Sequence, residues 1–461
     1  MAATGKRLLA REFFRNCRGS LTTTIAVSAL PIVLAIGVAI DMGRISMEQA
    51  AFTGAVDSAA LALAASPQGD LAGLSGTEKA TRIAQLKQLA ASYIDKNYSA
   101  TSEGGQQIAI SLDITGTTIT LSASHDYPTT IMAITGVTKT TLRAAAEVTK
   151  SGSSIEVALI LDNTASMAGS RITSLKAAAK KFVGIAIWPN QTPYYSKVAI
   201  VPYTMGVNVG GTYATLARGS VTSGTSTTPG STYYRFKNTS NQNTTFAISD
   251  CVSERTGAEA YTDTSVIAHK VGLNYPSPSN RCTTGTLLPL TSDKSALNAA
   301  IDAMAAAGST AGQVGVAWGW YALSPTFGLW SGASVPAAYG APHVKKFAIL
   351  MTDGEYNSPH CNGVIAKDAT SGSGSSSDHI NCNATNGDAY TQAQRLCTAM
   401  KQKGIIVYTI AFQLINTTAA QNLMTNCATD ASHRYDAANE AQLQTVFQTI
   451  ATNLLALRLS K

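Results

Sequence analysis

The chain has 461 residues, which is longer than one ordinary domain and long enough for two or three. Charged residues make up only 13% of it, and this composition suits a folded protein outside the cytoplasm better than a charged cytosolic enzyme. Four of its seven net positive charges lie before residue 20, so the rest of the chain has no basic stripe and no nucleic-acid partner is expected.

An uncharged run of twenty residues follows the basic tail formed by residues 1–20. As a helix, Leu21 to Ile40 would span roughly 30 Å, the thickness of the hydrocarbon core of a bilayer. A cleaved signal peptide usually has an apolar core of about 7 to 15 residues, and a buried core helix would not have such one-sided flanks. We therefore predict a transmembrane helix over 21–40. Because the basic residues precede it, we expect a single-pass protein of the bacterial inner membrane, with the N-terminus in the cytoplasm and the rest in the periplasm.

Residues 41–150 predict a small α+β unit next to the membrane. The Ala-rich, Pro-free stretch Met42 to Ala65 should continue the first helix beyond the bilayer, and Thr77 to Tyr98 should form a second helix. Gln106 to Ser124 alternates apolar and polar residues on either side of a Thr-Gly pair, which indicates a β-hairpin. Thr140 to Lys150 is a candidate for a further strand.

Residues 151–461 change to apolar runs separated by helical stretches, which predicts an α/β domain. Continuous apolar strands require burial on both faces, as in a doubly wound, mostly parallel sheet flanked by helices. The predicted strands are Glu156 to Leu161, Lys197 to Tyr203, Lys346 to Met351 and Ile405 to Phe412. The predicted helices include Arg171 to Ile187, Lys294 to Ala306, Gln313 to Leu323, Tyr390 to Lys403 and Glu440 to Leu457. Two polar stretches, at about 210–289 and 355–388, are too long for ordinary connections and are predicted to be surface insertions.

The seven cysteines divide in the same way as the predicted topology. Cys17 falls on the cytoplasmic side and the other six fall outside, where an oxidising compartment favours pairing. Sequence alone leaves about 15 connectivities open. Loop closure favours partners close in the chain, and we therefore predict pairs Cys251 with Cys282, Cys361 with Cys382, and Cys397 with Cys427. None lies in a CxxC or Cys/His pattern, so a zinc site is a poor alternative.

Carboxylates and hydroxyls follow two of the predicted strands. The first strand runs into Asp162-Asn163-Thr164-Ala165-Ser166, and a later one delivers Thr352-Asp353-Gly354 to the same edge of the sheet, where open α/β sheets bind ligands. Gly308-Ser309-Thr310, before another helix, adds further hydroxyls. This oxygen set predicts a hard cation, with Mg²⁺ first and Mn²⁺ or Ca²⁺ next. The alternative is that these residues only cap a helix and form a common Asp-Gly turn.

At these positions the chain resembles the von Willebrand factor A family, whose metal-ion-dependent adhesion site combines a DxSxS turn, a downstream Thr and the Asp of a TDG motif. The resemblance implies that the cation ligands are Asp162, Thr164, Ser166, Thr310 and Asp353. Thr164 stands where the pattern has Ser, which keeps the hydroxyl and adds a methyl group. We expect Asp162 to lie at a surface edge, so that Asp162→Ala would remove cation binding and leave the domain folded.

The N-terminal part resembles the TadE/TadG-like proteins of the tight-adherence (Flp) pilus system. The resemblance rests on Arg15-Asn16-Cys17-Arg18-Gly19-Ser20 before the apolar run, on Ile40-Asp41-Met42-Gly43-Arg44 and on the Ala-rich segment from Val56 to Ala62. Such a segment joined to a von Willebrand A domain is the TadG-like arrangement. Processed pilins of the wider group carry a Glu five residues after the cleavage Gly, where this chain has Thr24, so we expect an uncleaved anchor.

Together the resemblances imply a non-enzymatic component of pilus assembly or adhesion. Its partner would be a pilus or secretion-system protein that offers an Asp or Glu carboxylate to the bound cation. The alternative is an envelope scaffold in which the cation only stabilises the fold. A metal-dependent hydrolase is disfavoured because no His or Cys accompanies the predicted site and no nucleophile-base pair is evident.

Overall fold

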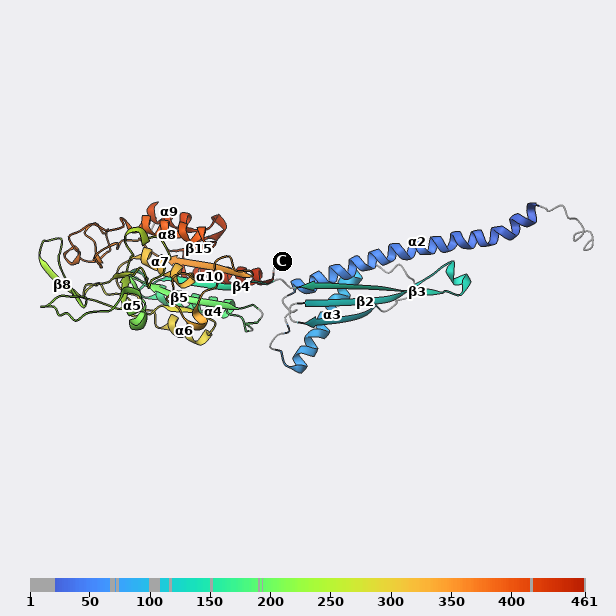
Figure 1. Ribbon diagram of the computed structural model, residues 1–461, viewed down its shortest axis with the longest axis horizontal. Coiled ribbons are helices and arrows are strands. Elements are labelled where there is room, and N and C mark those ends of the chain that lie inside the picture. The colour runs from blue at the N-terminus through green and yellow to red at the C-terminus, as the bar shows by residue number, and fades with distance from the viewer. Residues whose placement is uncertain are drawn as a thin grey trace, which may run out of the picture. The chain divides into compact units, whose positions relative to one another are not determined.

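The computed structural model describes residues 21–66, 71, 74–98, 108–115, 118–149, 152–189, 191–192, 194–414 and 418–459. The chain divides into two compact units, Met1–Lys150 and Ser151–Lys461. Figure 1 shows the elements of each unit. The basic tail and Cys17 lie outside the described residues.

The first unit packs two helices against one face of a three-stranded antiparallel sheet (Figure 1). The elements are α2 (Leu21–Ala65), α3 (Gly76–Asn97), β1 (Ala109–Thr115), β2 (Thr118–Pro128) and β3 (Lys139–Thr149). Buried residues of α2 recur at helical spacing from Phe52 to Leu63, and they pack with Leu86 of α3 and Leu121 of β2. The second helix, the hairpin and the third strand were all predicted from the sequence, within four residues at each end.

Helix α2 is longer than any bilayer requires. Its 45 residues extend about 68 Å at 1.5 Å per residue, more than twice the thickness of a hydrocarbon core. The C-terminal half packs on the sheet, whereas Val27, Val33 and Ile36 in the N-terminal half are more than half exposed. Over Val27–Ala64 it is the one described helix that is long and apolar enough to cross a membrane, judged by length and composition.

The second unit is built around a nine-stranded sheet in the order β10-β9-β6-β5-β4-β12-β15-β16, with β11 paired to β5. The strands are β4 (Ser154–Asp162), β5 (Ser196–Tyr203), β6 (Val207–Asn208), β9 (Cys251–Ser253), β10 (Gly272–Leu273), β11 (Leu288–Thr291), β12 (Val344–Thr352), β15 (Ile406–Phe412) and β16 (Arg434–Ala437). The five strands from β5 to β16 in this order are parallel, and β6, β9, β10 and β11 pair antiparallel. The sheet is therefore mixed, where the sequence predicted a mostly parallel one.

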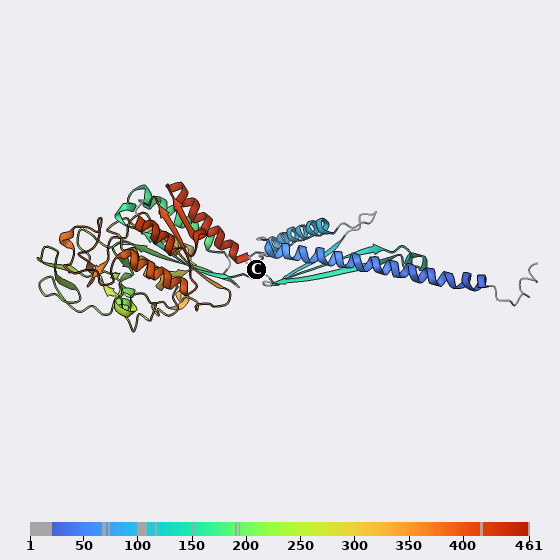
Figure 2. The ribbon, with the colours of Figure 1, turned by 90° about the horizontal axis from the view of Figure 1, so that it is seen from above.

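Helices cover both faces of this sheet, as expected for a doubly wound fold. The helices are α4 (Ser170–Ala186), α5 (Gly210–Arg218), α6 (Lys294–Asp302), α7 (Gly312–Leu323), α8 (Ala389–Gln402), α9 (Thr418–Cys427) and α10 (Glu440–Leu459). One core contains α7, α8 and α9, and the other contains α4, α6 and α10. Helix α10 packs along α4 (Figure 2). Helix α6 ends at Asp302 instead of the predicted Ala306, and Ala307 beyond it donates a backbone hydrogen bond to Asn163.

The two polar stretches are not only surface insertions, as the sequence predicted. The first contributes β9 and β10 to the main sheet and a hairpin of β7 (Tyr233–Lys237) with β8 (Asn243–Ala247). The second contains a short hairpin of β13 (His360–Cys361) with β14 (Val364–Ile365). Phe236 and Phe246 of the first share a small core with Val364 and Ile380 of the second. These strands of two to five residues are too short to produce a recognisable period in the sequence.

All three predicted disulfides are present. Cys251 pairs with Cys282, Cys361 with Cys382, and Cys397 with Cys427, with Cα–Cα distances of 6.4, 6.2 and 5.1 Å. The first two each lie within one insertion, and the third connects α8 to α9. Short-range loop closure was therefore sufficient to select one pairing among the possible ones.

Candidate functional site

Two carboxylates meet at one edge of the main sheet. Strands β4 and β12 are parallel neighbours whose register pairs Leu161 with Met351, so that Asp162 at the end of β4 and Asp353 just after β12 reach the same edge. Both side chains are almost fully buried. The parallel topology thus brings together two acids that are 191 residues apart in the chain.

Asp162 is surrounded by hydrogen-bond donors. Its Oδ1 accepts the backbone N–H of Thr164 at 2.9 Å and the Thr164 hydroxyl at 2.6 Å. Its Oδ2 accepts the hydroxyls of Thr352 at 2.7 Å and Tyr203 at 3.2 Å. The expectation that Asp162 lies at an exposed edge is wrong, because β4 is covered on both faces and the residue is 0% exposed.

Hydroxyls connect the two acids. The Oγ atoms of Thr164 and Ser166 lie 2.9 Å apart, and the Ser166 hydroxyl donates to Asp353 Oδ1 at 2.7 Å. A one-turn 3-10 helix, Ala165–Met167, orients Ser166 toward Asp353. Four of the five predicted residues therefore form one continuous chain of hydrogen bonds, with Ser166 the exposed member.

Thr310 lies in a loop that is attached to this turn by its backbone. Ala165 donates to the carbonyl of Gly308, and Ala307 donates to that of Asn163, both at 2.9 Å. The backbone N–H of Thr310 donates to Asn357 Oδ1 at 3.0 Å. Within the described residues, no hydrogen bond joins its side chain to the other four predicted residues. The structure brings its loop to the site but does not include its hydroxyl in the hydrogen-bond chain.

Arg171 belongs to the site and was not selected from the sequence. It lies in the first turn of α4, and its Nη1 is 2.7 Å from Asp353 Oδ2. The Asp353 side chain is fully buried, whereas that of Arg171 is 34% exposed. A positive charge at a helix N-terminus is unfavourable with respect to the helix dipole. Its place one turn after Ser166 could therefore have indicated an acidic partner.

The electrostatics of the site favour a positive charge. Burial, together with the neighbouring Asp353, raises the pKa of Asp162 to about 6, although hydrogen bonds from Thr164 and Thr352 act in the opposite direction. Arg171 offsets part of this repulsion from the Asp353 side. The site has two carboxylates and several hydroxyls, which are ligands that suit Mg²⁺.

The site contains few of the side chains that bind metal ions strongly. The described residues contain no cluster of three or more His, Cys, Asp or Glu side chains that could hold a metal ion. Both amide atoms of Asn163, next to Asp162, are buried and without a hydrogen-bond partner in the described structure. A buried polar group without a partner costs stability unless it meets a ligand or water. The residues present thus fit a hard cation that is bound largely through hydroxyls and water.

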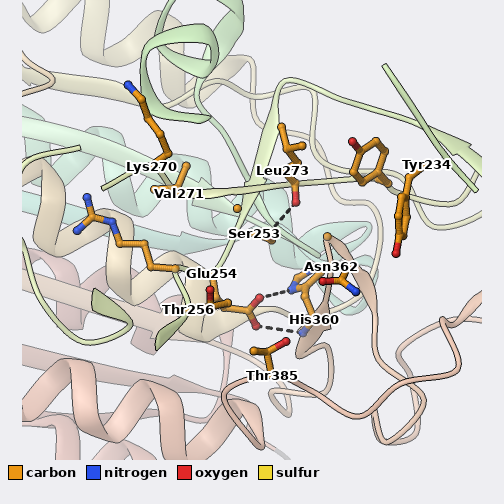
Figure 3. Close-up of a pocket in the computed structure, with 14 residues that line it drawn as sticks. Tyr234, Ser253, Glu254, Thr256, Lys270, Val271, Leu273, His360, Asn362 and Thr385 are labelled. Carbon is orange, nitrogen blue, oxygen red and sulfur yellow. Dashed lines mark hydrogen bonds and ion pairs between the residues drawn. The ribbon is translucent and has the colours of Figure 1, made fainter. Parts of the chain in front are cut away.

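A separate cavity of about 610 Å³ is lined by residues of both insertions (Figure 3). In its wall Glu254 points toward His360, with 2.9 Å between Oε2 and Nδ1, while Lys270 extends away from this pair. Burial alone would raise the pKa of Glu254, but His360 and a hydrogen bond from Gln313 hold that pKa below its usual range. The buried Glu254 carboxylate thus has its nearest polar partners, His360 and Gln313, within the protein.

Gln313 connects this cavity to the loop around Thr310. Its Nε2 donates to Glu254 Oε1 at 2.8 Å and to the carbonyl of Ser358 at 3.0 Å. The backbone N–H of Ser358 in turn donates to the carbonyl of Thr310 at 3.1 Å. The insertions therefore help to hold the loop that carries the fifth predicted residue.

No curated protein matches this chain. Among solved structures, it is similar to the von Willebrand factor domain of the type V pili tip protein Mfa5 from Porphyromonas gingivalis, with 14% identity and a TM-score of 0.37 over 66% of this chain and 96% of that one. The pilus adhesin SpaC from Lactobacillus rhamnosus GG matches with 13% identity and a TM-score of 0.36 over 78% of this chain. The pilus adhesin RrgA from Streptococcus pneumoniae matches with 9% identity and a TM-score of 0.34 over 74% of this chain. The chain spans 35% of SpaC and 49% of RrgA.

One family model matches the N-terminal part of the chain. It is described as "Putative Flp pilus-assembly TadE/G-like" and matches residues 19–66, which include all of α2. This segment, the long apolar helix that begins the described structure, is therefore similar to Flp pilus-assembly proteins of the TadE/G-like family.

Proposed function

We propose that this protein is a membrane-anchored component of a tight-adherence (Flp) pilus assembly or adhesion system, and that it binds a protein partner through a cation. The family match over residues 19–66 supports the pilus association. The observation that carries the binding proposal is the Ser166 hydroxyl, which connects the Asp162–Thr164 turn to the buried carboxylate of Asp353. Two acids held together in this way are a preorganised place for a divalent cation.

The cation would be Mg²⁺, with Mn²⁺ or Ca²⁺ as alternatives. The residues that would hold it are Asp162, Thr164, Ser166, Thr310 and Asp353. When bound, the cation would supply an open coordination position that accepts an Asp or Glu oxygen from a pilus or secretion-system protein. Ser166 is exposed, and so the partner would approach from its side of the site.

The alternative function is an envelope scaffold whose cation is purely structural. Hydrolysis is disfavoured by the chemistry of the site, since the Ser166 hydroxyl donates to a carboxylate that is already paired with Arg171. An activated serine requires a base that is free to take its proton. The two non-enzymatic functions differ in whether partner binding needs the cation.

Partner binding is expected to depend on the cation. The tagged full-length chain, expressed in its own host and extracted in mild detergent without cross-linking, should capture pilus-assembly proteins in Mg²⁺ and lose them in EDTA. Ser166→Ala should weaken this capture at least several-fold because it removes one ligand and the connection to Asp353. Ser170→Ala is the matched control, since Ser170 bonds only to Glu440 among the described residues. Capture that EDTA leaves unchanged would favour the scaffold.

The topology is open to a direct test. Five of the six charged residues before Leu21 are basic, so the N-terminus is expected to remain in the cytoplasm. Alkaline phosphatase fused after Lys461 should then be active, because this reporter folds only outside the cytoplasm. A stably expressed but inactive fusion would reverse the proposed orientation.

A further inference from the structure

The loop between β2 and β3, residues 129–138, is apolar at its tip. Its sequence TTIMAITGVT contains no charged residue, and it includes the 3-10 helix Met132–Thr135. Ile134 is 77% exposed and Val137 is 42% exposed. Loops between strands are ordinarily polar, and apolar residues exposed close together mark a contact with another molecule or with a membrane.

This β2–β3 loop is held against α2 at one level of the helix. The Asp41 carboxylate accepts the backbone N–H groups of Thr130, Ile131 and Met132 at 3.1, 2.7 and 2.7 Å. Arg44 donates to the Thr130 hydroxyl at 3.0 Å. Asp41 is only 3% exposed, so its carboxylate interacts with the loop and not with solvent.

Gly37 makes the close approach possible. A Cβ atom at Gly37 would lie 2.3 Å from Ile131 Cγ2, so a larger residue there would push the loop off the helix. Gly37 lies three residues before Ile40, the end of the apolar run, and a rise of about 1.5 Å per residue puts it roughly 5 Å inside that end. The loop therefore reaches past the point where the proposed transmembrane segment leaves the bilayer.

Backbone N–H groups of the loop also find hydrogen-bond partners within the loop itself, which a lipid environment requires. Val137 donates to the carbonyl of Met132, Gly136 to that of Ala133, and Ile134 to that of Ile131, at 3.1 to 3.2 Å. Together with the three bonds to Asp41, these leave few loop N–H groups in need of water. Unsatisfied backbone groups are what keep ordinary loops out of hydrocarbon.

We propose that the β2–β3 loop inserts Ile134 and Val137 into the outer surface of the same bilayer that α2 spans. This rests on the membrane anchor of the proposed function. The apolar tip would contact lipid and not another protein, because it forms one apolar surface with α2. Ile36 and Ile40 of that helix are exposed at the same level. Arg44 and Lys139 at the base of the loop are suitably placed for phosphate headgroups. The loop and helix would then form two attachments that fix the three-stranded sheet against the membrane.

An environment-sensitive label tests the insertion. The full-length protein in a Cys17→Ser background, with Ile134→Cys labelled by the fluorophore NBD, is reconstituted into vesicles of phosphatidylcholine and phosphatidylglycerol. Its emission should shift to the blue and be quenched by lipids with a spin label near the headgroup. The matched control is Glu147→Cys, exposed on β3 and distant from the loop, which should be quenched by aqueous iodide only.

The outcomes separate the loop from the anchor. If carbonate extraction releases the protein from the vesicles, the anchor itself fails and the insertion with it. If the protein stays in the membrane but position 134 is as accessible to iodide as position 147, the insertion is wrong while the anchor stands. Protection of position 134 from both quenchers would mean that protein, such as a second copy, covers the tip, and this would also overturn the proposal.

A second pair of variants tests the apolar requirement. With the label at Val137→Cys, an added Ile134→Asp should abolish quenching by spin-labelled lipid, because a charge opposes entry into hydrocarbon. Ile134→Leu should preserve it. Ile134 is mostly exposed, so neither change should unfold the sheet. Equal lipid quenching in the two variants would contradict insertion through Ile134.

Discussion

Millimolar Mg²⁺ is expected to raise the melting temperature of the purified full-length protein, and Asp353→Asn is expected to abolish that rise. A ligand that binds only the folded state stabilises it by about 2.7 kcal/mol at a concentration one hundred times its dissociation constant. Asn keeps an oxygen that accepts from Ser166 but removes one of the two carboxylates. Differential scanning calorimetry in detergent, with and without EDTA, gives the measurement.

Two further variants make this test specific. Arg171→Gln should lower the Mg²⁺ concentration needed for half the shift, because it removes a positive charge 2.7 Å from Asp353 and leaves the oxygen ligands in place. Asp162→Ala should lower the melting temperature even in EDTA, since it leaves the buried donors of Thr164 and Thr352 unsatisfied at roughly 1 to 3 kcal/mol each. Asp353→Asn is therefore the cleaner substitution.

A wild type that shows no shift with Mg²⁺, Mn²⁺ or Ca²⁺ would contradict the cation proposal. Asp162 and Ser166 would then act as turn residues, and Asp353 would serve as the partner of Arg171. An unchanged shift in Asp353→Asn would place the cation elsewhere in the chain. Either result would favour the scaffold.

Removal of the Cys397–Cys427 disulfide is expected to cost about 3 to 4 kcal/mol of unfolding free energy, from the entropy of a loop of about 30 residues in the unfolded chain. Both cysteines are fully buried between α8 and α9. The double variant Cys397→Ser, Cys427→Ser should therefore unfold at a clearly lower urea concentration. Tryptophan fluorescence reports this, because all four tryptophans lie in the second unit.

The control for this measurement is Cys17→Ser, which removes a cysteine outside all three disulfides. Its urea midpoint should match the wild type. Equal midpoints for the double variant and the wild type would show that the third disulfide contributes nothing to stability. Alkylation of six free thiols in the native protein would show that the pairs do not form at all.

Periodic elements were readable because burial leaves a local pattern. Strands β4, β5, β12 and β15 are covered on both faces, so their central residues are mostly apolar and the strands can be recognised without any alignment. The β1–β2 hairpin shows a period of 2 because one face of its sheet is buried. Helix α2 was predicted from the length of its uncharged run and from its Ala-rich continuation. The disulfide pairs could also be predicted, because each partner is within about 31 residues of the other.

The convergence of the site was expected from topology, but its environment was not. Asp162 and Asp353 were expected at the same edge because each follows the carboxyl end of a predicted parallel strand. That the two strands are neighbours was shown only by the structure. The contact of Arg171 with Asp353 joins residues 182 apart, and the full burial of Asp162 depends on Tyr203 and Thr352 closing over it. A local sequence pattern does not show which side chains of two elements far apart in the chain will be in contact.

The same distinction holds in the first unit and in the insertions. Asp41 could be placed after the apolar run from sequence, but its three bonds to the β2–β3 loop required the fold of the sheet, about 90 residues further on. Strands β9 and β10 have only three and two residues, too few for any periodicity, and they exist because the edge of a sheet supplies partners for their backbone groups. Pattern therefore predicts which residues are buried within an element, and long-range packing determines which polar groups those elements bring together.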